Sequence, residues 1–504
     1  MENEILDVLI VGAGLSGIGA AVHLTKRCPG KSFAIVEGRE RLGGTWDLFR
    51  YPGIRSDSDM YTLGYNFKPW TARKAIADAP SILNYLEETV SEYGLREKIR
   101  FNRKVVDASW SSEEALWTVT LAHGDGTHSI VKCNFLHMCS GYYDYQQGHN
   151  PDFPGKADFA GDIVHPQFWP DDLDYAGKKV VVIGSGATAV TLVPSMAETA
   201  SHVTMLQRSP TYIVSRPGED KWALRLRKFL PGKLAYLLTR WKNVLLGIFM
   251  FNLARKKPAA FKDRLLEMVR EEMGPDVDMA NFTPSYNPWD QRLCLVPDSD
   301  LFDSIKSGKA SIVTGHIETF TKDGIKLKSG ETLEADVIVT ATGLKMLTGG
   351  SAAISVDGQT VNFGEKINYK GVMFSGIPNF GMTMGYTNAS WTLKADLTSE
   401  YVCRLINYMD EHGTPIATPT LPAGETMGTE PMLDFSSGYV QRAIKDLPKQ
   451  GDRKPWRLNQ NFPKDIINLR HKTVNDGVMV FSKAGAAEKS GSTLPVEEQA
   501  IAAE

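Results

Sequence analysis

The chain has 504 residues, of which 42% are hydrophobic and 23% charged, and its net charge at pH 7 is −3. This length exceeds one ordinary hydrophobic core and predicts two or three domains. Because basic and acidic residues are nearly balanced, the composition indicates no nucleic-acid partner. The five cysteines form no CxxC pair. Their spacing is typical of a reducing compartment and predicts neither a disulfide framework nor a metal site.

The N-terminal segment lacks the basic region of a signal peptide, and its apolar run has the length of a strand. We expect no membrane-spanning helix, because no apolar stretch of the sequence is as long as the roughly 18 residues that such a helix needs. We therefore expect a cytoplasmic protein.

The segment from Leu6 to Glu37 has the pattern of a dinucleotide-binding unit. An apolar strand, residues 6–11, is followed by the turn Gly12-Ala-Gly14-Leu-Ser16-Gly17, a helical segment, and a second strand at 33–36 that ends on Glu37. In such units the glycines admit a pyrophosphate close to the backbone, the helix N-terminus supplies partial positive charge, and the acidic residue accepts from a ribose hydroxyl. A turn that merely needs glycine would not account for Glu37.

The residues after this unit favour FAD as its ligand. Gly43-Gly44-Thr45-Trp46 follows Glu37 where flavoproteins commonly bring a second glycine pair against the cofactor. Residues 47–70 then mix aromatic side chains with paired charges around a Pro-Gly turn. We interpret this segment as a shaped polar pocket; surface ion pairs are the alternative. The candidate cofactor contacts up to residue 105 are Gly12, Gly14, Ser16, Gly17, Glu37, Gly44, Thr45, Trp46, Arg55, Asp57 and Val105.

A second unit of the same kind begins at residue 179. The strand 179–183 meets the turn Gly184-Ser185-Gly186-Ala-Thr188-Ala189, and the next strand, 202–206, leads into Gln207-Arg208-Ser209. An NAD site would carry an acidic residue here, whereas an arginine beside a hydroxyl suits the 2′-phosphate of NADPH. The candidate NADPH contacts are Gly184, Ser185, Gly186, Thr188, Ala189, Arg208 and Ser209.

Residues 217–285 interrupt this α/β pattern with a helical, basic segment that is rich in Trp, Phe and Leu. One interpretation is an insertion that packs on a nucleotide domain. The other is a peripheral membrane contact, because basic amphipathic helices with bulky apolar faces lie in bilayer interfaces. The sequence leaves both open.

The order of these segments predicts an α/β fold with two Rossmann-type dinucleotide-binding domains, for FAD and NADP, and a helical insertion. An apolar strand that ends on Ala341-Thr-Gly343 is typical of a chain that crosses back between such domains. The expected divisions are 1–145 and 336–480 for the FAD domain, 146–216 and 286–335 for the NADP domain with its linker, 217–285 for the insertion, and 481–504 for a disordered tail.

An FAD beside an NADPH can reduce a disulfide, pass electrons onward or activate oxygen. The first outcome needs a redox-active cysteine pair and the second usually needs a haem or clustered thiolate ligands, and the sequence shows neither. Oxygen activation needs a reduced flavin, a dry pocket and a cation, so it is the chemistry we expect.

The linker before the second unit carries a resemblance to a known family. Phe159-x-Gly161-x-x-x-His165-x-x-x-Trp169-Pro170 matches the fingerprint of the type I Baeyer–Villiger flavoprotein monooxygenases, within the flavin-containing monooxygenase superfamily. Segments such as GGTWDLFRYPGIRSDSDMYTLGYNFKPW, YNPWDQRLCLVPDSDLF and GYTNASWTLKADL resemble its ethionamide-activating branch. The resemblance covers nearly the whole chain.

The resemblance implies an activity. NADPH reduces the flavin, molecular oxygen adds to give a C4a-peroxyflavin, and a ketone becomes an ester or lactone; sulfoxidation of sulfur-containing substrates is implied too. By motif, Arg292 would stabilise the peroxide and Asp57 would orient that arginine. A fixed cation aimed at developing negative charge contributes about 3 to 4 kcal/mol. His165 is interpreted as controlling domain position and not as a base.

Two rival functions stay open at this point. One is a flavin-containing monooxygenase limited to nitrogen and sulfur oxygenation, against which Trp169-Pro170 argues. The other is a non-catalytic redox sensor that binds FAD and NADPH. The natural substrate and the oligomeric state do not follow from the sequence.

Overall fold

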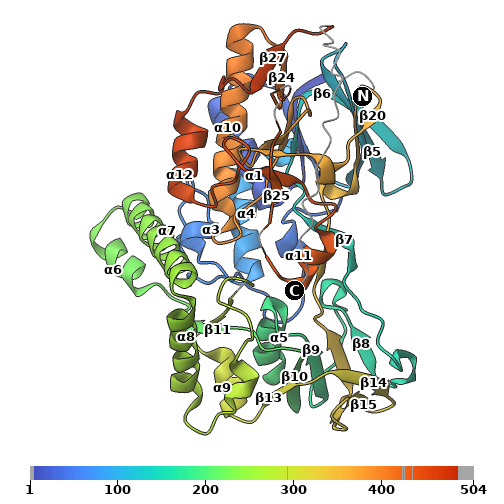
Figure 1. Cartoon of the computed structure of the whole chain (residues 1–504), viewed down its shortest axis with the longest axis vertical. Helices are drawn as coiled ribbons and strands as arrows, with labels where there is room; N and C mark the ends of the chain where they lie inside the picture. Colours follow the sequence, from blue (N-terminus) through green and yellow to red (C-terminus); the bar gives the residue numbers. More distant parts are fainter. Residues whose placement is uncertain (1–4, 292, 423, 425, 434, 486–504) are drawn as a thin grey trace.

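The computed structural model describes residues 5–291, 293–422, 424, 426–433 and 435–485. Two α/β domains lie one above the other in Figure 1, with a helical insertion along one side. The expected α/β fold with two Rossmann-type domains is confirmed by this arrangement of parallel sheets.

The first domain is built on a nine-stranded sheet. Its parallel part consists of β23 (Phe380–Met382), β6 (His128–Met138), β1 (Ile5–Val11), β2 (Phe33–Val36) and β3 (Ile99–Arg100). Beyond β6 the sheet continues with β5 (Leu116–His123), β4 (Arg103–Ser111), β19 (Ala353–Val356) and β20 (Gln359–Thr360). Since β19 and β23 come from the C-terminal half, both ends of the chain build this domain.

Helices cover one face of the parallel strands, and strands cover the other. The residues of β2 are all buried: Phe33 and Ile35 pack in the same core as the helices, and Ala34 and Val36 pack in the core that contains β4 and β5. The covering helices are α1 (Leu15–Arg27), α4 (Ala79–Glu92) and α10 (Trp391–His412), and α1 lies against α10 (Figure 1). Short helices α2 (Thr45–Leu48) and α3 (Met60–Leu63) lie in the segment that was interpreted as a pocket.

The second domain has a five-stranded parallel sheet in the order β13-β10-β9-β17-β8. These strands are β13 (Ala310–Thr314), β10 (His202–Gln207), β9 (Lys179–Ile183), β17 (Val337–Thr340) and β8 (Asp162–Val164), with α5 (Ala187–Ala197) and α9 (Asp300–Lys306) on one face. Because β17 pairs with both β9 and β8, the chain crosses back after residue 340, a few residues later than the division expected at 336.

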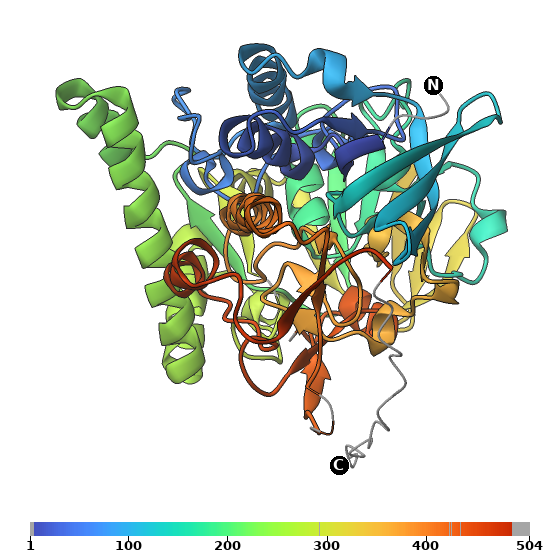
Figure 2. The same ribbon diagram turned by 90° about the horizontal axis from the view of Figure 1, so that it is seen from above.

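Two antiparallel strands, β7 (Tyr143–Gly148) and β18 (Leu344–Met346), carry the chain between the domains in both directions. The helical insertion follows β11 (Ile213–Arg216) and comprises α6 (Lys221–Phe229), α7 (Gly232–Lys256) and α8 (Pro258–Met273), as expected. Viewed from above, α7 and α8 run along one edge of the molecule (Figure 2).

The other described elements are shorter. The helices and helical turns are η1 (Arg96–Lys98), η2 (Lys156–Asp158), η3 (Pro166–Phe168), η4 (Met279–Phe282), η5 (Gly349–Ser351), η6 (Phe363–Glu365), α11 (Gly438–Ala443), α12 (Phe462–Ile466) and η7 (Ile467–His471). The strands are β12 (Cys294–Pro297), β14 (Ile317–Thr321), β15 (Gly324–Leu327), β16 (Thr332–Glu334), β21 (Asn368–Tyr369), β22 (Met373–Phe374), β24 (Ile416–Pro419), β25 (Thr429–Pro431), β26 (Lys449–Gly451) and β27 (Met479–Ser482). The expected tail from 481 begins within β27, and its residues 486–504 lie outside the described residues.

Candidate cofactor and active site

A cavity of about 580 Å³ lies between the two domains, and we call it the cleft. Residues of the first glycine turn, the segment 43–58 and α5 of the second domain all line it. Every candidate cofactor contact up to residue 105 except Gly17 is among the lining residues: Gly12, Gly14, Ser16, Glu37, Gly44, Thr45, Trp46, Arg55, Asp57 and Val105. The structure therefore brings together residues that are far apart in the sequence.

Backbone geometry explains the glycines of the first turn. Gly12 has φ +103°, and a Cβ there would lie 2.7 Å from the carbonyl oxygen of Cys139. At Gly17 a Cβ would overlap the carbonyl oxygen of Gly12. Gly17 therefore lets α1 approach β1 and does not itself line the cleft. Gly44, with φ +58°, faces Gly14 so closely that a Cβ would lie 3.1 Å from the Cα of Gly14. The two glycine turns thus leave backbone, not side chains, against the cleft.

Glu37 follows β2 and is buried beside the first turn. Its carboxylate accepts hydrogen bonds from the backbone N–H of Ala13, at 2.8 Å, and of Arg39, at 2.9 Å. Burial raises the pKa of Glu37, and the two backbone donors oppose this shift. A buried carboxylate held at the end of the second strand occupies the place where this fold binds a ribose.

The charged residues between 47 and 59 do not all line the cleft. Arg50 donates to Asp47 at 3.2 Å and does not line the cleft, so it belongs to the cluster around this buried aspartate. Arg55 instead reaches across to the second domain, where it pairs with Asp300 of α9 at 2.5 Å. Asp57 lines the cleft as expected.

The second glycine turn repeats the geometry of the first. Gly184 has φ +137°, and a Cβ there would overlap the carbonyl oxygen of Ala341. Ser185 donates to the carbonyl of Ser209 at 3.2 Å, which joins the turn to the end of β10. Thr188 lines the cleft, whereas Ala189 is buried in the domain core. Gly186 precedes α5, so the helix N-terminus is open to a phosphate group.

A second cation lies near Arg208, and the sequence gave no reason to select it. Arg442 of α11 is close enough that Arg208 acts on its pKa, which burial and then the neighbouring guanidinium hold below the usual value. Neither guanidinium has a hydrogen bond or ion pair with another described residue. Two neighbouring exposed cations suit a doubly charged phosphate.

The fingerprint residues lie where the second sheet meets the interdomain strands. Phe159 is buried in the core beside that sheet, and a Cβ at Gly161 would overlap the carbonyl oxygen of Asp336. Trp169 packs with Tyr175 on the other core of the same domain, just before Pro170. Phe159, Gly161 and Trp169 therefore serve the packing of the second domain.

His165 lies against the strands that join the two domains. Its Nδ1 accepts from the backbone N–H of Gln167 at 3.2 Å, and its ring fills the space that a side chain at Gly148 of β7 would occupy. Burial lowers the pKa of His165. Because burial favours the neutral ring, the geometry agrees with the interpretation that His165 acts through position.

Two aromatic residues of the cleft were missed as site residues. Trp391 donates through Nε1 to Ser16 at 2.7 Å and stacks on Tyr142 at 5.0 Å, and Tyr386 donates to Asp465 at 2.8 Å. Both line the cleft. Both belong to the segment GYTNASWTLKADL, and the two aromatic residues at positions 386 and 391 could have marked it as part of the site.

A second cavity, of about 740 Å³, adjoins the cleft, and we call it the chamber. Asp57, Ser58, Leu295 and Ala389 line both. The chamber extends beneath α7, which contributes mainly apolar side chains to its wall. Arg292, the expected catalytic cation, lies outside the described residues, although its neighbour Leu293 lines the chamber. Among the described residues, no group of His, Cys, Asp and Glu is arranged to hold a metal ion.

Comparison with known families decides the class of this protein. The model of the flavin-binding monooxygenase-like family matches residues 75–347, and that of an NAD(P)-binding Rossmann-like domain matches residues 10–70. This chain belongs to the flavin-binding monooxygenase family. The enzyme is 54% identical to the FAD-containing monooxygenase EthA of Mycobacterium tuberculosis H37Rv, over 96% of this chain and 99% of that protein. It is 50% identical to the putative FAD-containing monooxygenase MymA of the same strain, over 96% of this chain and 98% of MymA.

Solved structures agree with this family. The oxidized steroid monooxygenase bound to NADP matches with a TM-score of 0.69 and 26% identity, over 83% of this chain and 88% of that one. The monooxygenase OTEMO in complex with FAD and NADP matches with a TM-score of 0.68 and 25% identity, over 82% and 86%. The predicted flavoprotein monooxygenase of the Baeyer–Villiger type is thereby confirmed, as is an enzymatic function.

Proposed function

We propose that this enzyme uses FAD, NADPH and molecular oxygen to convert ketones into esters or lactones and to oxygenate sulfur in suitable substrates. The observation that carries this proposal is a single cleft lined by both dinucleotide units. In the overall reaction one oxygen atom enters the substrate, the other leaves as water, and NADPH supplies two electrons. Bound FAD supplies the redox centre at which those electrons meet oxygen.

The residues of the cleft fit an FAD. The backbone of Gly12, Gly14 and Gly44 is open to a pyrophosphate because no side chains intervene, and Glu37 presents a buried carboxylate to a ribose. Trp46 and Trp391 line the cleft with aromatic surface. We infer that these residues hold the cofactor and keep its surroundings dry.

The second unit fits NADPH in the same way. Gly184 and Gly186 would admit the pyrophosphate at the start of α5, and Arg208 with Arg442 would hold the 2′-phosphate. Because Thr188 of this unit already lines the cleft, the nicotinamide end has a direct route to the FAD site.

Arg292 and Asp57 are the proposed polar groups of the reaction. The guanidinium of Arg292 would stabilise negative charge that develops on oxygen, and Asp57, which lines both cavities, would orient it. A ketone or thio group would reach this point from the chamber, whose wall is shared with the cleft at Leu295 and Ala389.

We propose that the enzyme is located in the cytoplasm and that its helical insertion makes peripheral contact with a membrane. One helix, Gly232–Lys256, is long and apolar enough to cross a bilayer, with a mean hydropathy of 1.2. This corrects the expectation that no segment reaches that length. Only 28% of the apolar stretch of this helix is buried, so the insertion both packs on the first domain and exposes apolar surface.

A panel of ketones and thioethers tests the proposed reaction. Purified holoenzyme should consume NADPH faster when a ketone is added and should form a product that is heavier by one oxygen atom and has an ester or lactone spectrum. Arg292→Ala should abolish ester formation while NADPH is still oxidised. If thioethers yield sulfoxides and no ketone yields an ester, the enzyme oxygenates heteroatoms only and the proposal is wrong.

A further inference from the structure

Helices α6 and α7 expose an unusual amount of apolar surface. Its residues, which we call the insertion face, are Trp222, Phe229, Leu234, Leu237, Leu238, Leu245, Leu246 and Phe249, each at least 42% exposed. The other large exposed apolar residues in the described part of the chain are scattered over separate elements. A contiguous apolar face of this kind marks an interaction surface, because single exposed residues are common but clusters are not.

The charge of the same segment specifies the partner. Residues 221–257 contain ten Lys and Arg and no Asp or Glu, whereas the whole chain has a net charge of −3. Several cations, among them Lys221, Arg225, Lys228 and Lys233, are exposed beside the insertion face. Bulky apolar residues bordered by cations match the boundary of an anionic bilayer, where acyl chains lie beneath negative headgroups.

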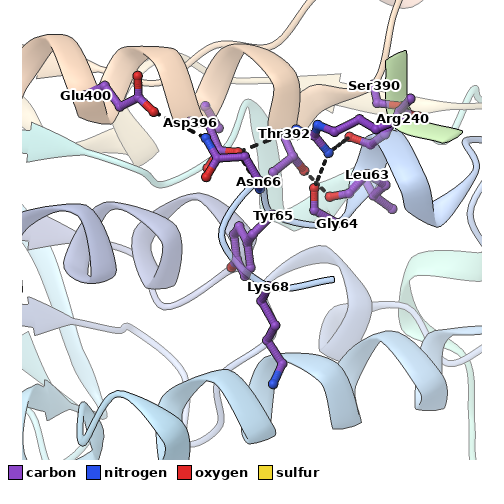
Figure 3. A network of polar contacts seen from close by, with 12 residues as sticks. Leu63, Gly64, Tyr65, Asn66, Lys68, Arg240, Ser390, Thr392, Asp396 and Glu400 are labelled. Atoms are coloured by element: carbon purple, nitrogen blue, oxygen red, sulfur yellow. Dashed lines mark hydrogen bonds and ion pairs between the residues drawn. The ribbon is translucent and has the colours of Figure 1, made fainter. Parts of the chain in front are cut away.

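The inner side of α7 shows that the helix would lie on a bilayer and not cross it. Arg240 is buried and donates to the carbonyl oxygen of Tyr61 at 2.8 Å. It also donates to the carbonyl oxygen of Gly64 at 2.7 Å (Figure 3). Its other terminal nitrogen lies 3.5 Å from the carboxylate of Asp396. A spanning orientation would break these bonds and leave a charged group in hydrocarbon, which is unfavourable.

The chamber begins at the insertion face and ends at the cleft. Trp222 and Leu246 belong to the insertion face and also line the chamber. Along its wall, Ile248, Met250 and Phe251 of α7 supply apolar surface. At the far end the chamber meets the cleft at Leu295 and Ala389. The chamber thus connects the outer face of α7 with the proposed reaction site, with apolar side chains of α7 on one wall and polar residues such as Asp59 and Asn388 on the others.

We propose that the insertion face docks on an anionic bilayer and that the chamber receives apolar substrates directly from it. The substrate class is a long-chain ketone, or a molecule with a sulfur centre on a similar apolar body, that partitions into lipid. This proposal rests on the proposed function for its chemistry, but the docking step does not depend on turnover.

Vesicle flotation tests the docking step by itself. The holoenzyme should float with vesicles that contain phosphatidylglycerol and phosphatidylcholine in equal parts, and at least tenfold less with pure phosphatidylcholine. The double variant Leu245→Asp, Phe249→Asp removes apolar surface outside the chamber and should reduce flotation at least tenfold. The control Ile130→Asp, Ile467→Asp makes the same change at two exposed positions on other elements and should float like the parent. Equal flotation of the two double variants would overturn the docking surface.

Turnover then tests the route. We expect the Leu245→Asp, Phe249→Asp variant to keep its kcat/KM for a short water-soluble ketone and to lose at least tenfold for 2-tridecanone presented in the anionic vesicles. Gly247→Phe, at a chamber position where a Cβ meets open space, should lower the ratio of kcat/KM for the long over the short ketone at least tenfold. Unchanged ratios in both variants would contradict the route. If no ketone is turned over by any form while flotation behaves as expected, the reaction assignment fails and the docking surface stands.

Discussion

At the scale of single residues, we propose that the phosphate end of the NADPH site includes a cation that is distant in sequence from its Rossmann unit. Arg208 follows β10 and Arg442 belongs to α11, yet the two guanidinium groups act on each other. We expect Arg442→Ala to raise the KM for NADPH about tenfold or more, since a hydrogen bond to a charged group contributes about 1.5 to 3 kcal/mol. The KM for NADH, which lacks the 2′-phosphate, should change little. Steady-state kinetics with both nucleotides checks this, and Lys445→Ala, an exposed cation just beyond the same helix, is the control.

His165 gives a second prediction at this scale. If it acts by holding the interdomain strands, His165→Ala should lower kcat about tenfold without changing the shape of the pH–rate profile, because no proton transfer is lost. His165→Asn places an acceptor near the position of Nδ1, which accepts from Gln167, and should recover much of the rate. A profile that loses one limb in His165→Ala would show instead that the imidazole moves a proton.

At the scale of elements, α7 is attached to the first domain by Arg240. Its guanidinium satisfies carbonyl groups of the segment around α3 and approaches Asp396 of α10 (Figure 3). Removing one partner of such a buried set costs about 3 to 5 kcal/mol. We expect Arg240→Met to lower the Tm clearly and to make α7 the first site of limited proteolysis, whereas the exposed Arg225→Met should leave both unchanged. Proteolysis that begins elsewhere would mean that other contacts hold α7.

The same helix shows what the sequence can and cannot predict. Each Rossmann unit was recognisable because its glycines, apolar strands and terminal residues lie within a short stretch whose spacing is set by local geometry. The helical insertion was also recognisable from its pattern. Which face of α7 packs was not predictable, since the buried side carries the polar residues Thr239 and Arg240, whereas many of the leucines are exposed. The packed face is decided by carbonyl groups of residues 61–64, far away in the sequence.

The residues of the site also fall into those whose place the sequence predicts and those whose place depends on the tertiary structure. The positions of Glu37 and Arg208, directly after β2 and β10, were predictable because each follows a strand of its own unit. The partner of Arg55 was not, since Asp300 is brought near by the packing of two domains, and Asp57 or Asp59 are closer in sequence. Arg442 and Tyr386 likewise reach the site only because the C-terminal half returns to the first domain.

At the scale of the whole molecule, the Arg55–Asp300 pair is a contact between the domains beside the cleft. Burial raises the pKa of Asp300. The carboxylate must be ionised to pair, so the pair is present above this raised pKa and is lost as the pH falls through it, at a higher pH than for an ordinary aspartate. A looser domain contact should let water into the cleft, so that more NADPH is oxidised without product formation.

Asp300→Asn should therefore behave at every pH as the parent enzyme does in acid. We expect the yield of oxygenated product per NADPH to fall with decreasing pH in the parent and to be lower and nearly flat in Asp300→Asn. Asp303→Asn, on the same helix but paired with Lys306 at the surface, is the control and should follow the parent. Product and NADPH measured together across the pH range decide the matter. If the yield of product per NADPH falls with pH in the same way in all three proteins, the titrating group is another residue. The Arg55–Asp300 pair would then have no effect on how NADPH oxidation is coupled to oxygenation.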